Sequence, residues 1–171
     1  MKKLAIATSM IAALTAAGMA NAASTGVITF KGELNASTCD VQIDGQTNDA
    51  TVTLPTVGTN QLTAAGQTAG RTNFNMGLTN CAGTLQTASA FFEDGASVDP
   101  ATGRLRNVSG TATQVGYQLR DDSSPTQDVI QVGNGSQVAN ATYVDVSTGS
   151  ATLPYAVEYY ADGTTTAGTV I

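Results

Sequence analysis

Short stretches of alternating apolar and polar residues recur along the chain, and turn-forming residues close most of them. Side chains two residues apart in an extended strand share one face, so such alternation indicates strands with one buried face. The alternating stretches are residues 51–54, 74–78, 115–119 and 153–159, and residues 88–92 and 129–132 are short apolar stretches that also predict strands. Residues 60–70 are mostly Gly, Ala, Thr and Gln, which predicts a loop, and no helical period appears after residue 22. This pattern predicts an all-β sandwich with no repeat and no domain linker.

Residues 26–34 form a further alternating stretch, before the first cysteine. Gly26, Ile28, Phe30, Gly32 and Leu34 share one parity, and the residues between them are mostly polar. The stretch predicts a strand that buries its apolar side. Taken by itself, it fits an ordinary first strand of the domain.

The first 22 residues have the organisation of a signal peptide. Lys2 and Lys3 form a basic start, residues 4–17 are small and apolar, and Ala20-Asn21-Ala22 is a cleavage tripeptide. The apolar run is too short to span a bilayer stably, and no second run follows. We therefore expect an exported protein that does not span a membrane.

Removal of residues 1–22 leaves 149 residues with five basic side chains against thirteen acidic ones, a net charge of −8. This length suits one domain with a real core. The acidic balance argues against nucleic acid and against anionic membrane surfaces as partners.

The sequence holds no histidine, so a catalytic thiol or hydroxyl has no imidazole base and a zinc site has too few ligands. The densest acidic groups are Glu93-Asp94, Asp121-Asp122 and Asp128, and we expect all of them at solvated turns. None has the spacing of a calcium loop. Arg104 and Arg106 are predicted to be strand-surface charges. We therefore expect no catalysis, metal or cofactor, which argues against a small periplasmic hydrolase.

Cys39 and Cys81 are the two cysteines of the chain. In an exported protein an even number of cysteines predicts a disulfide. The bridge would close a loop of about 43 residues, for which the chain-entropy estimate is roughly 4 kcal/mol.

Three stretches resemble type 1-like pilins, the fimbrial subunits that the chaperone–usher pathway assembles. The first is Ile28-Thr29-Phe30-Lys31-Gly32-Glu33-Leu34 with Cys39 shortly after it. The second is the alternating strand from Phe74 that ends in Asn80-Cys81. The third is the late strand Leu153-Pro154-Tyr155-Ala156-Val157-Glu158-Tyr159-Tyr160. Together with the leader and the cysteine spacing, these stretches cover nearly the whole chain after residue 22.

The resemblance implies an incomplete immunoglobulin-like sandwich that lacks its final strand and is completed by a strand donated from another subunit. It divides the chain into a signal peptide (1–22), a donor-strand extension (23–34) and a pilin domain (35–171). Gly26, Ile28, Phe30, Gly32 and Leu34 would then contact the neighbouring subunit. Implied partners are identical or related pilins, a periplasmic chaperone and an outer-membrane usher, on a route through the periplasm to a fimbrium on the cell surface.

Two further expectations come from the ends of the domain. The family usually closes with an alternating strand, whereas this sequence stops at Thr169-Val170-Ile171, which we expect to lie in mid-strand of a truncated or partial chain. A minor adaptor or adhesin, or a secreted binding module, is the alternative function. The donor-like stretch follows the cleavage site closely and leaves no room for a separate N-terminal lectin domain, so we expect a shaft subunit.

Overall fold

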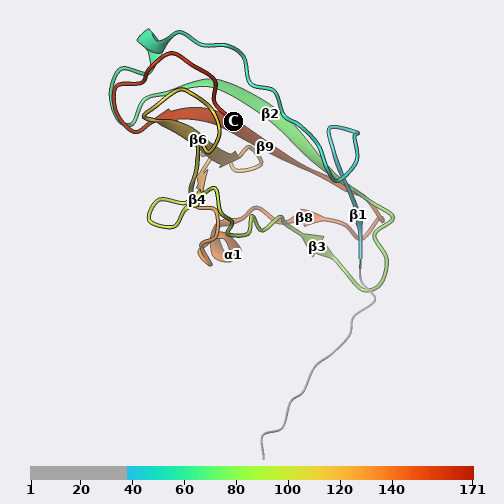
Figure 1. Ribbon diagram of the computed structural model, residues 1–171. Helices are drawn as coiled ribbons and strands as arrows, with labels where there is room; N and C mark the ends of the chain where they lie inside the picture. The colour runs from blue at the N-terminus through green and yellow to red at the C-terminus, as the bar shows by residue number, and fades with distance from the viewer. Residues whose placement is uncertain (1–37) are drawn as a thin grey trace, which may run out of the picture. The chain divides into compact units, whose positions relative to one another are not determined.

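The computed structural model describes residues 38–171, and every structural statement below concerns this part of the chain. It is built almost entirely from strands, with a single 3-10 turn and one short helix (Figure 1). The strands are β1 (Asp40–Ile43), β2 (Thr68–Thr79), β3 (Thr87–Ala88), β4 (Val98–Asp99), β5 (Arg104–Arg106), β6 (Val115–Asp121), β7 (Val129–Ile130), β8 (Val144–Asp145) and β9 (Ala151–Ala161); η1 is Thr59–Gln61 and α1 is Gln137–Asn140. The predicted all-β class is confirmed.

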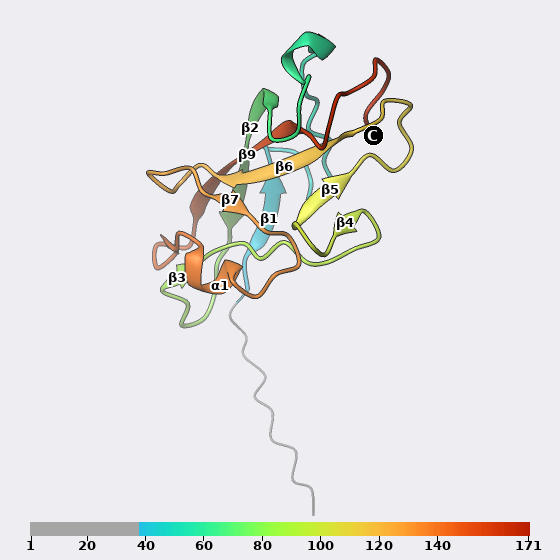
Figure 2. The same ribbon diagram turned by 90° about the vertical axis from the view of Figure 1, so that its left-hand side faces the viewer.

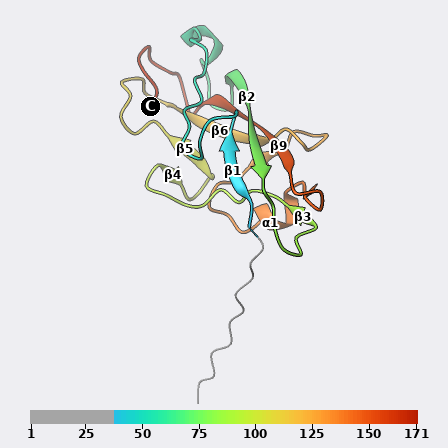
Figure 3. The same cartoon turned by 90° about the vertical axis from the view of Figure 1, so that its right-hand side faces the viewer.

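The strands form one large antiparallel sheet in the order β1-β2-β9-β6-β5-β4, with β7 also paired to β6, and a separate β3-β8 pair. The long strands β2 and β9 span the domain, β1 lies at one end of them, and β6, β5 and β4 lie at the other (Figure 1). Because β1 and β6 face each other across the interior in the two side views, the sheet is curled (Figures 2 and 3). The curl lets one sheet enclose much of its own core.

The three clearest alternating stretches are confirmed as β2, β6 and β9. The stretches at 88–92 and 129–132 form much shorter strands than predicted, and β4 and β8 were not predicted as strands because two residues are too few for a clear period. The predicted loop at 60–70 is partly wrong, since β2 already begins at Thr68. Gly70 lies at a bulge near the start of β2 with φ +66°, a conformation that favours glycine. A Cβ added at this position would also come within 2.9 Å of the Tyr159 ring.

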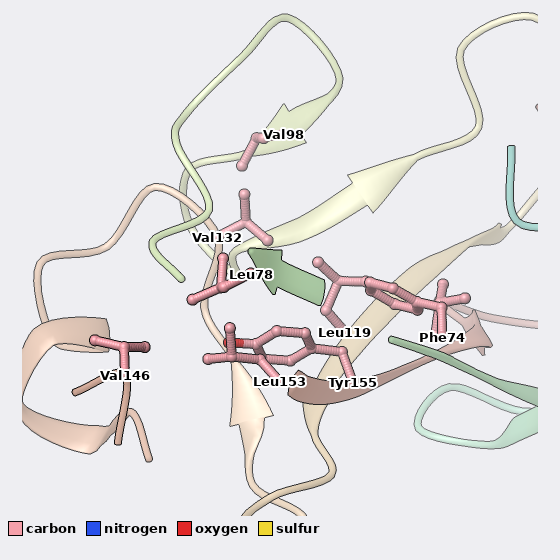
Figure 4. Packing of buried hydrophobic residues seen from close by; sticks show 9 residues of the cluster. Phe74, Leu78, Val98, Leu119, Val132, Val146, Leu153 and Tyr155 are labelled. Carbon is pink, nitrogen blue, oxygen red and sulfur yellow. The ribbon is translucent and has the colours of Figure 1, made fainter. Parts of the chain in front are cut away.

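The main core lies between the inner face of the sheet and the segments that carry β3, β8 and α1. Phe74 on β2 is opposite Tyr155 on β9, and their rings are 5.8 Å apart. Phe92 meets the edge of the Tyr155 ring from the neighbouring segment at 5.1 Å, while the adjacent Phe91 is exposed. Figure 4 shows the core side chains converging on one another: Phe74, Leu78, Val98, Leu119, Val132, Val146, Leu153 and Tyr155.

A smaller apolar cluster lies at the other end of β9. Leu62, Ala112, Val115 and Ala161 are buried there, and Val57, Tyr159 and Val170 pack against them while staying partly exposed. The cluster has few buried members, so this end of the domain holds the less complete part of the core.

A disulfide joins Cys39, just before β1, to Cys81, just after β2. The expected pairing is confirmed, and the bridge ties the first strand to the strand that holds Phe74 and Leu78. It fixes the open end of a two-strand ladder whose register runs from Asp40 opposite Thr79 to Ile43 opposite Met76.

The disulfide should be a large part of the stability of the domain. Replacing both cysteines (Cys39→Ala with Cys81→Ala) should lower the free energy of unfolding by about 3–4 kcal/mol, because the unfolded chain regains the freedom of a long loop. Urea unfolding followed by circular dichroism measures this. Wild-type protein treated with a reductant is the control and should lose a similar amount, and an unchanged unfolding midpoint in both samples would show that the bridge adds no stability.

Candidate functional site

Residues 50–57, here called the unpaired segment, are unusual in having no backbone hydrogen bond to any described residue. The segment lies between β1 and η1. Val52, Leu54 and Val57 are half-buried against the two apolar clusters, whereas Thr51 and Thr53 are exposed. The side chains therefore alternate as in a strand, but the strand predicted at 51–54 is wrong as a hydrogen-bonded element. The prediction failed because none of the described strands forms hydrogen bonds with the backbone of this segment.

Unpaired peptide groups beside an apolar surface are costly when they leave water, so they need a partner on burial. A segment with this alternation has the side-chain arrangement of a strand and lacks only the ladder. The segment can therefore act chemically as an acceptor for an extended chain, through main-chain N–H and C=O groups at regular spacing.

A hollow of about 530 Å³ opens at the end of the unpaired segment. Its apolar lining comes from Val57, Leu62, Ala112, Val115, Tyr159 and Val170, so it exposes the edge of the smaller apolar cluster. Tyr117 on β6 stacks on Tyr159 with ring centroids 5.7 Å apart, and both rings stay partly exposed. Burial, and then the neighbouring Tyr159 phenol, raises the pKa of Tyr117 above its ordinary value of 10.0, so the ring is neutral at physiological pH.

The segment that contains residues 162–171 forms another wall of this hollow. It is held by the loop that follows β5: Val108 N–H donates to the Ile171 carbonyl, and Ala112 N–H donates to the Thr169 carbonyl. The Asn107 side chain bonds both segments of this contact, since its Nδ2 donates to the Ala112 and Thr169 carbonyls and its Oδ1 accepts from Ile171 N–H. Residues 169–171 are not in a strand, so the expected mid-strand geometry is wrong.

The face of the sheet turned away from the main core holds a buried carboxylate, Glu158 of β9, which is 3% exposed. Arg71 Nε donates to it at 3.0 Å, Arg120 Nε donates at 2.6 Å, and the Gln118 amide donates at 2.9 Å. Burial alone would raise the pKa of Glu158, but the hydrogen bonds from Arg120, Arg71 and Gln118 outweigh it and hold the pKa below the ordinary 4.5. The pairing of two arginines with one acid keeps β2, β9 and β6 together on this face.

The predicted turn acids behave in two ways. Glu93, Asp94 and Asp128 are exposed, as expected. The expectation is wrong for Asp121, which is 5% exposed because its two oxygens accept from the backbone N–H groups of Ser123 and Thr142. It anchors two loops. Within residues 38–171 no group of three or more His, Cys, Asp or Glu side chains could hold a metal ion, and no helix is long and apolar enough to cross a membrane.

The proposed donor residues Gly26, Ile28, Phe30, Gly32 and Leu34 lie outside the described residues. Of the residues singled out from the sequence, the structure brings together Cys39 and Cys81, and it places Arg104 and Arg106 on β5 as predicted. Sequence reasoning missed the unpaired segment and the Glu158 network. The alternation of Val52 and Leu54 was a signal for the former, but no pattern in one sequence shows that a strand lacks its partner.

Comparison with known proteins identifies the family. Residues 54–171 match the family described as FimA, type-1 fimbrial protein, A. The chain belongs to the type-1 fimbrial protein family. It is a structural subunit of a fimbrium, the adhesive fibre on the cell surface.

Several curated relatives match over most of their length. The major fimbrial subunit SMF-1 of Stenotrophomonas maltophilia is 42% identical, with 92% of this chain and 93% of the relative covered. The F17 fimbrial protein of Escherichia coli is 33% identical, with 99% and 94% covered. A solved structure, the type I fimbria protein and antigen of Burkholderia pseudomallei, is 26% identical, covers 76% of this chain and 85% of its own, and has a TM-score of 0.46.

The Glu158 network makes stability depend on pH in a defined direction. Because folding lowers the pKa of this carboxyl below 4.5, its contribution is present above that pH and is lost as the pH falls through the folded-state pKa. Glu158→Gln leaves Arg71 and Arg120 without their acid, so it should cost about 2–3 kcal/mol at pH 7.

The test is urea unfolding of both proteins between pH 7 and pH 3. The gap in unfolding free energy should narrow below pH 4.5. Asp99, Asp128 and Asp145 also have lowered pKa values, so acid destabilises both proteins through these groups. This effect is common to both and cancels when one unfolding free energy is subtracted from the other. A gap that stays constant over this range would contradict the role of the ionised carboxylate.

Proposed function

We propose that this fimbrial subunit polymerises by strand donation, with the unpaired segment as the acceptor and residues 26–34 of another copy as the donor. The observation that carries the proposal is the unpaired segment itself: its side chains alternate as in a strand, and its backbone has no partner among the described residues. Strand addition to an open edge is an established mode of recognition, and pilin assembly is one of its known examples.

The donor stretch has the chemistry that this acceptor needs. Its main chain can supply a hydrogen-bond ladder to residues 50–57, whatever the side chains are. Ile28, Phe30 and Leu34 place apolar groups on one face, and each would gain about 1.5–3 kcal/mol on full burial, as an upper estimate. Val52 and Leu54 are half-buried on the acceptor and would be covered by the same event.

Gly32 gives the donor its register. A glycine on the apolar face leaves space where the acceptor is shallow, so sliding the donor by two residues would place Phe30 or Leu34 at the position that only glycine fits. In this proposal the stretch is the donated strand and not the first strand of its own domain.

The route to the fibre follows from the same proposal. Residues 1–22 direct export and are removed, a periplasmic chaperone protects the acceptor until assembly, and an outer-membrane usher joins the subunits. Before assembly the exposed backbone of residues 50–57 and the apolar hollow are an aggregation hazard, which is the physical need that a chaperone meets. The name of the 42%-identical relative, a major fimbrial subunit, favours a shaft subunit over a minor one.

The proposal predicts that an appended donor stabilises the isolated subunit. A copy of residues 24–34 joined after Ile171 by a flexible linker makes the encounter intramolecular. Ile171 lines the hollow together with Val57, so the linker starts close to the acceptor. The melting temperature should rise by about 10 °C or more, and the fused protein should remain monomeric in size-exclusion chromatography.

Two variants of the appended copy serve as matched controls. Ile28→Asp with Phe30→Asp keeps the length and backbone of the donor but removes its apolar groups, and it should give little or no stabilisation. Gly32→Leu should stabilise less than the unaltered copy by about 1–3 kcal/mol, because the larger side chain overpacks a shallow position. Equal melting temperatures for the parent and all three fusions would overturn strand donation to this subunit.

A further inference from the structure

A second cavity, here called the α1 cavity, has a volume of about 250 Å³ and lies between β7 and α1. Its lining comes from the β7 segment (128–131), from the α1 segment (136, 137, 140 and 141) and from Ala90, Asp121 and Tyr155. It shares no lining residue with the hollow beside the unpaired segment, so the two are separate sites of the described domain.

Three polar side chains in the lining are free to bond a ligand. Gln131 and Asn140 are exposed and Ser136 is partly buried, and none of these side chains has a hydrogen bond to another described residue. An amide group and a hydroxyl group can each both donate and accept a hydrogen bond. A ligand in the α1 cavity can therefore bond the β7 segment and the α1 segment at the same time.

Two carboxylates in the lining are held in position and keep acceptor capacity. Asp128 accepts at 2.8 Å from the hydroxyl groups of Thr126 and Ser124, one at each oxygen. These hydrogen bonds hold the pKa of Asp128 below its ordinary 3.8, so it is ionised at physiological pH. Asp121 accepts one backbone N–H at each oxygen. Because a carboxylate has about four acceptor sites, both groups can still accept from a ligand hydroxyl.

Tyr155 supplies a buried hydroxyl group to the cavity. The residue is 3% exposed, and its ring contacts the rings of Phe74 and Phe92, which fix its position. Ala90 N–H donates to the hydroxyl oxygen at 3.3 Å, and the hydroxyl hydrogen has no acceptor among the described residues. Burial raises the pKa of Tyr155 above its ordinary 10.0, so the group keeps this hydrogen and can donate it to a ligand.

The lining therefore asks for a ligand that both donates and accepts hydrogen bonds. An anion can accept from Tyr155 but cannot donate to Asp121 and Asp128, and no basic side chain lines the cavity to offset its charge. An ammonium group can donate to the two carboxylates but has no acceptor for the Tyr155 hydroxyl. The hydroxyl groups of a neutral sugar meet both requirements, because each of them donates one hydrogen and accepts at its oxygen.

The size and the apolar part of the lining agree with this ligand. The α1 cavity is smaller than the roughly 300–1,000 Å³ of sites for drug-sized ligands, so it suits one sugar ring and not a chain of rings. Val129, Ile130 and Ala141 supply aliphatic surface for the C–H groups of such a ring. We infer that the α1 cavity binds one neutral monosaccharide unit at the end of a glycan, which gives this fimbrial subunit a carbohydrate-binding site of its own.

The site belongs to a single subunit and does not depend on strand donation. A free sugar makes few contacts, so its dissociation constant should be on the order of 1 mM. Every copy of the subunit in a fibre carries the site. A fibre therefore binds a surface that displays many such glycans far more tightly than one copy binds one sugar.

Saturation-transfer difference NMR on purified fibres tests the site. The neutral probes are D-glucose, D-galactose, D-mannose, L-fucose and N-acetyl-D-glucosamine; D-glucuronate is the anionic probe and choline the cationic one. At least one neutral sugar, added up to about 50 mM, should give a saturable signal with a dissociation constant on the order of 1 mM. Glucuronate and choline should bind at least about tenfold more weakly, because neither meets both requirements of the lining.

The variant Gln131→Ala with Asn140→Ala removes two side chains that bond no other described residue, so folding and assembly should be unaffected. The dissociation constant of the bound sugar should rise about tenfold, because two hydrogen bonds are lost. The matched control, Gln46→Ala with Asn48→Ala, removes the same two residue types from exposed positions outside the cavity and should leave binding unchanged. If the double variant yields no fibres, each single variant takes its place and should weaken binding about threefold.

Three results would overturn the carbohydrate site. One is the absence of a saturable signal from every neutral sugar. Another is a sugar signal of equal strength in wild-type fibres and in fibres of the Gln131→Ala, Asn140→Ala variant, since the sugar would then bind elsewhere on the fibre. The third is tighter binding of choline or glucuronate than of any neutral sugar. All three leave strand donation untouched, because residues 50–57 contribute nothing to the lining of the α1 cavity.

Discussion

The pairing of backbone hydrogen bonds is the constraint on which the structure of this subunit depends. The central strand β9 forms long antiparallel hydrogen-bond ladders with β2 on one side and with β6 on the other. Residues 50–57 have the side-chain alternation of a strand, but their backbone has no hydrogen-bond partner among residues 38–171. In the proposed mechanism, an extended strand from another copy supplies the missing ladder and joins the two subunits.

The two ends of the main sheet contribute differently to this behaviour. The disulfide and the packing around Tyr155 hold the end near β1 and the central part of the sheet, so the subunit keeps its shape before assembly. The smaller cluster, with Tyr159 and Val57 only partly buried, keeps apolar surface available. On the outer face Glu158 draws Arg71 and Arg120 together, and these ion pairs join β2, β9 and β6.

Much of the fold could be predicted from the sequence because alternation is strong where strands are long. Phe74, Leu119 and Tyr155 lie in stretches that alternate over five or more residues, and all three are buried where the pattern placed them. The short strands β4 and β8 could not be predicted, because two residues carry no period and their pairing is set by tertiary contacts. Burial of Asp121 and Glu158 was also beyond reach, since it depends on donors distant in the sequence, such as Thr142 and Arg71. For the unpaired segment, the alternation of residues 51–54 predicted which side chains face the core, but it could not predict that the backbone lacks a partner among the described residues.

Backbone amide hydrogen exchange in residues 51–57 tests the central claim most directly. Pro55 has no amide, but the other residues of this range report whether the unpaired segment gains a ladder. The account predicts fast exchange in the isolated subunit and slowing by about 100-fold or more in assembled fibres, while amides in the middle of β9 are protected in both states. Exchange at residues 51–57 that is equally fast in subunit and fibre, or already slow in the isolated subunit, would contradict the claim that these residues are the open acceptor of the fold.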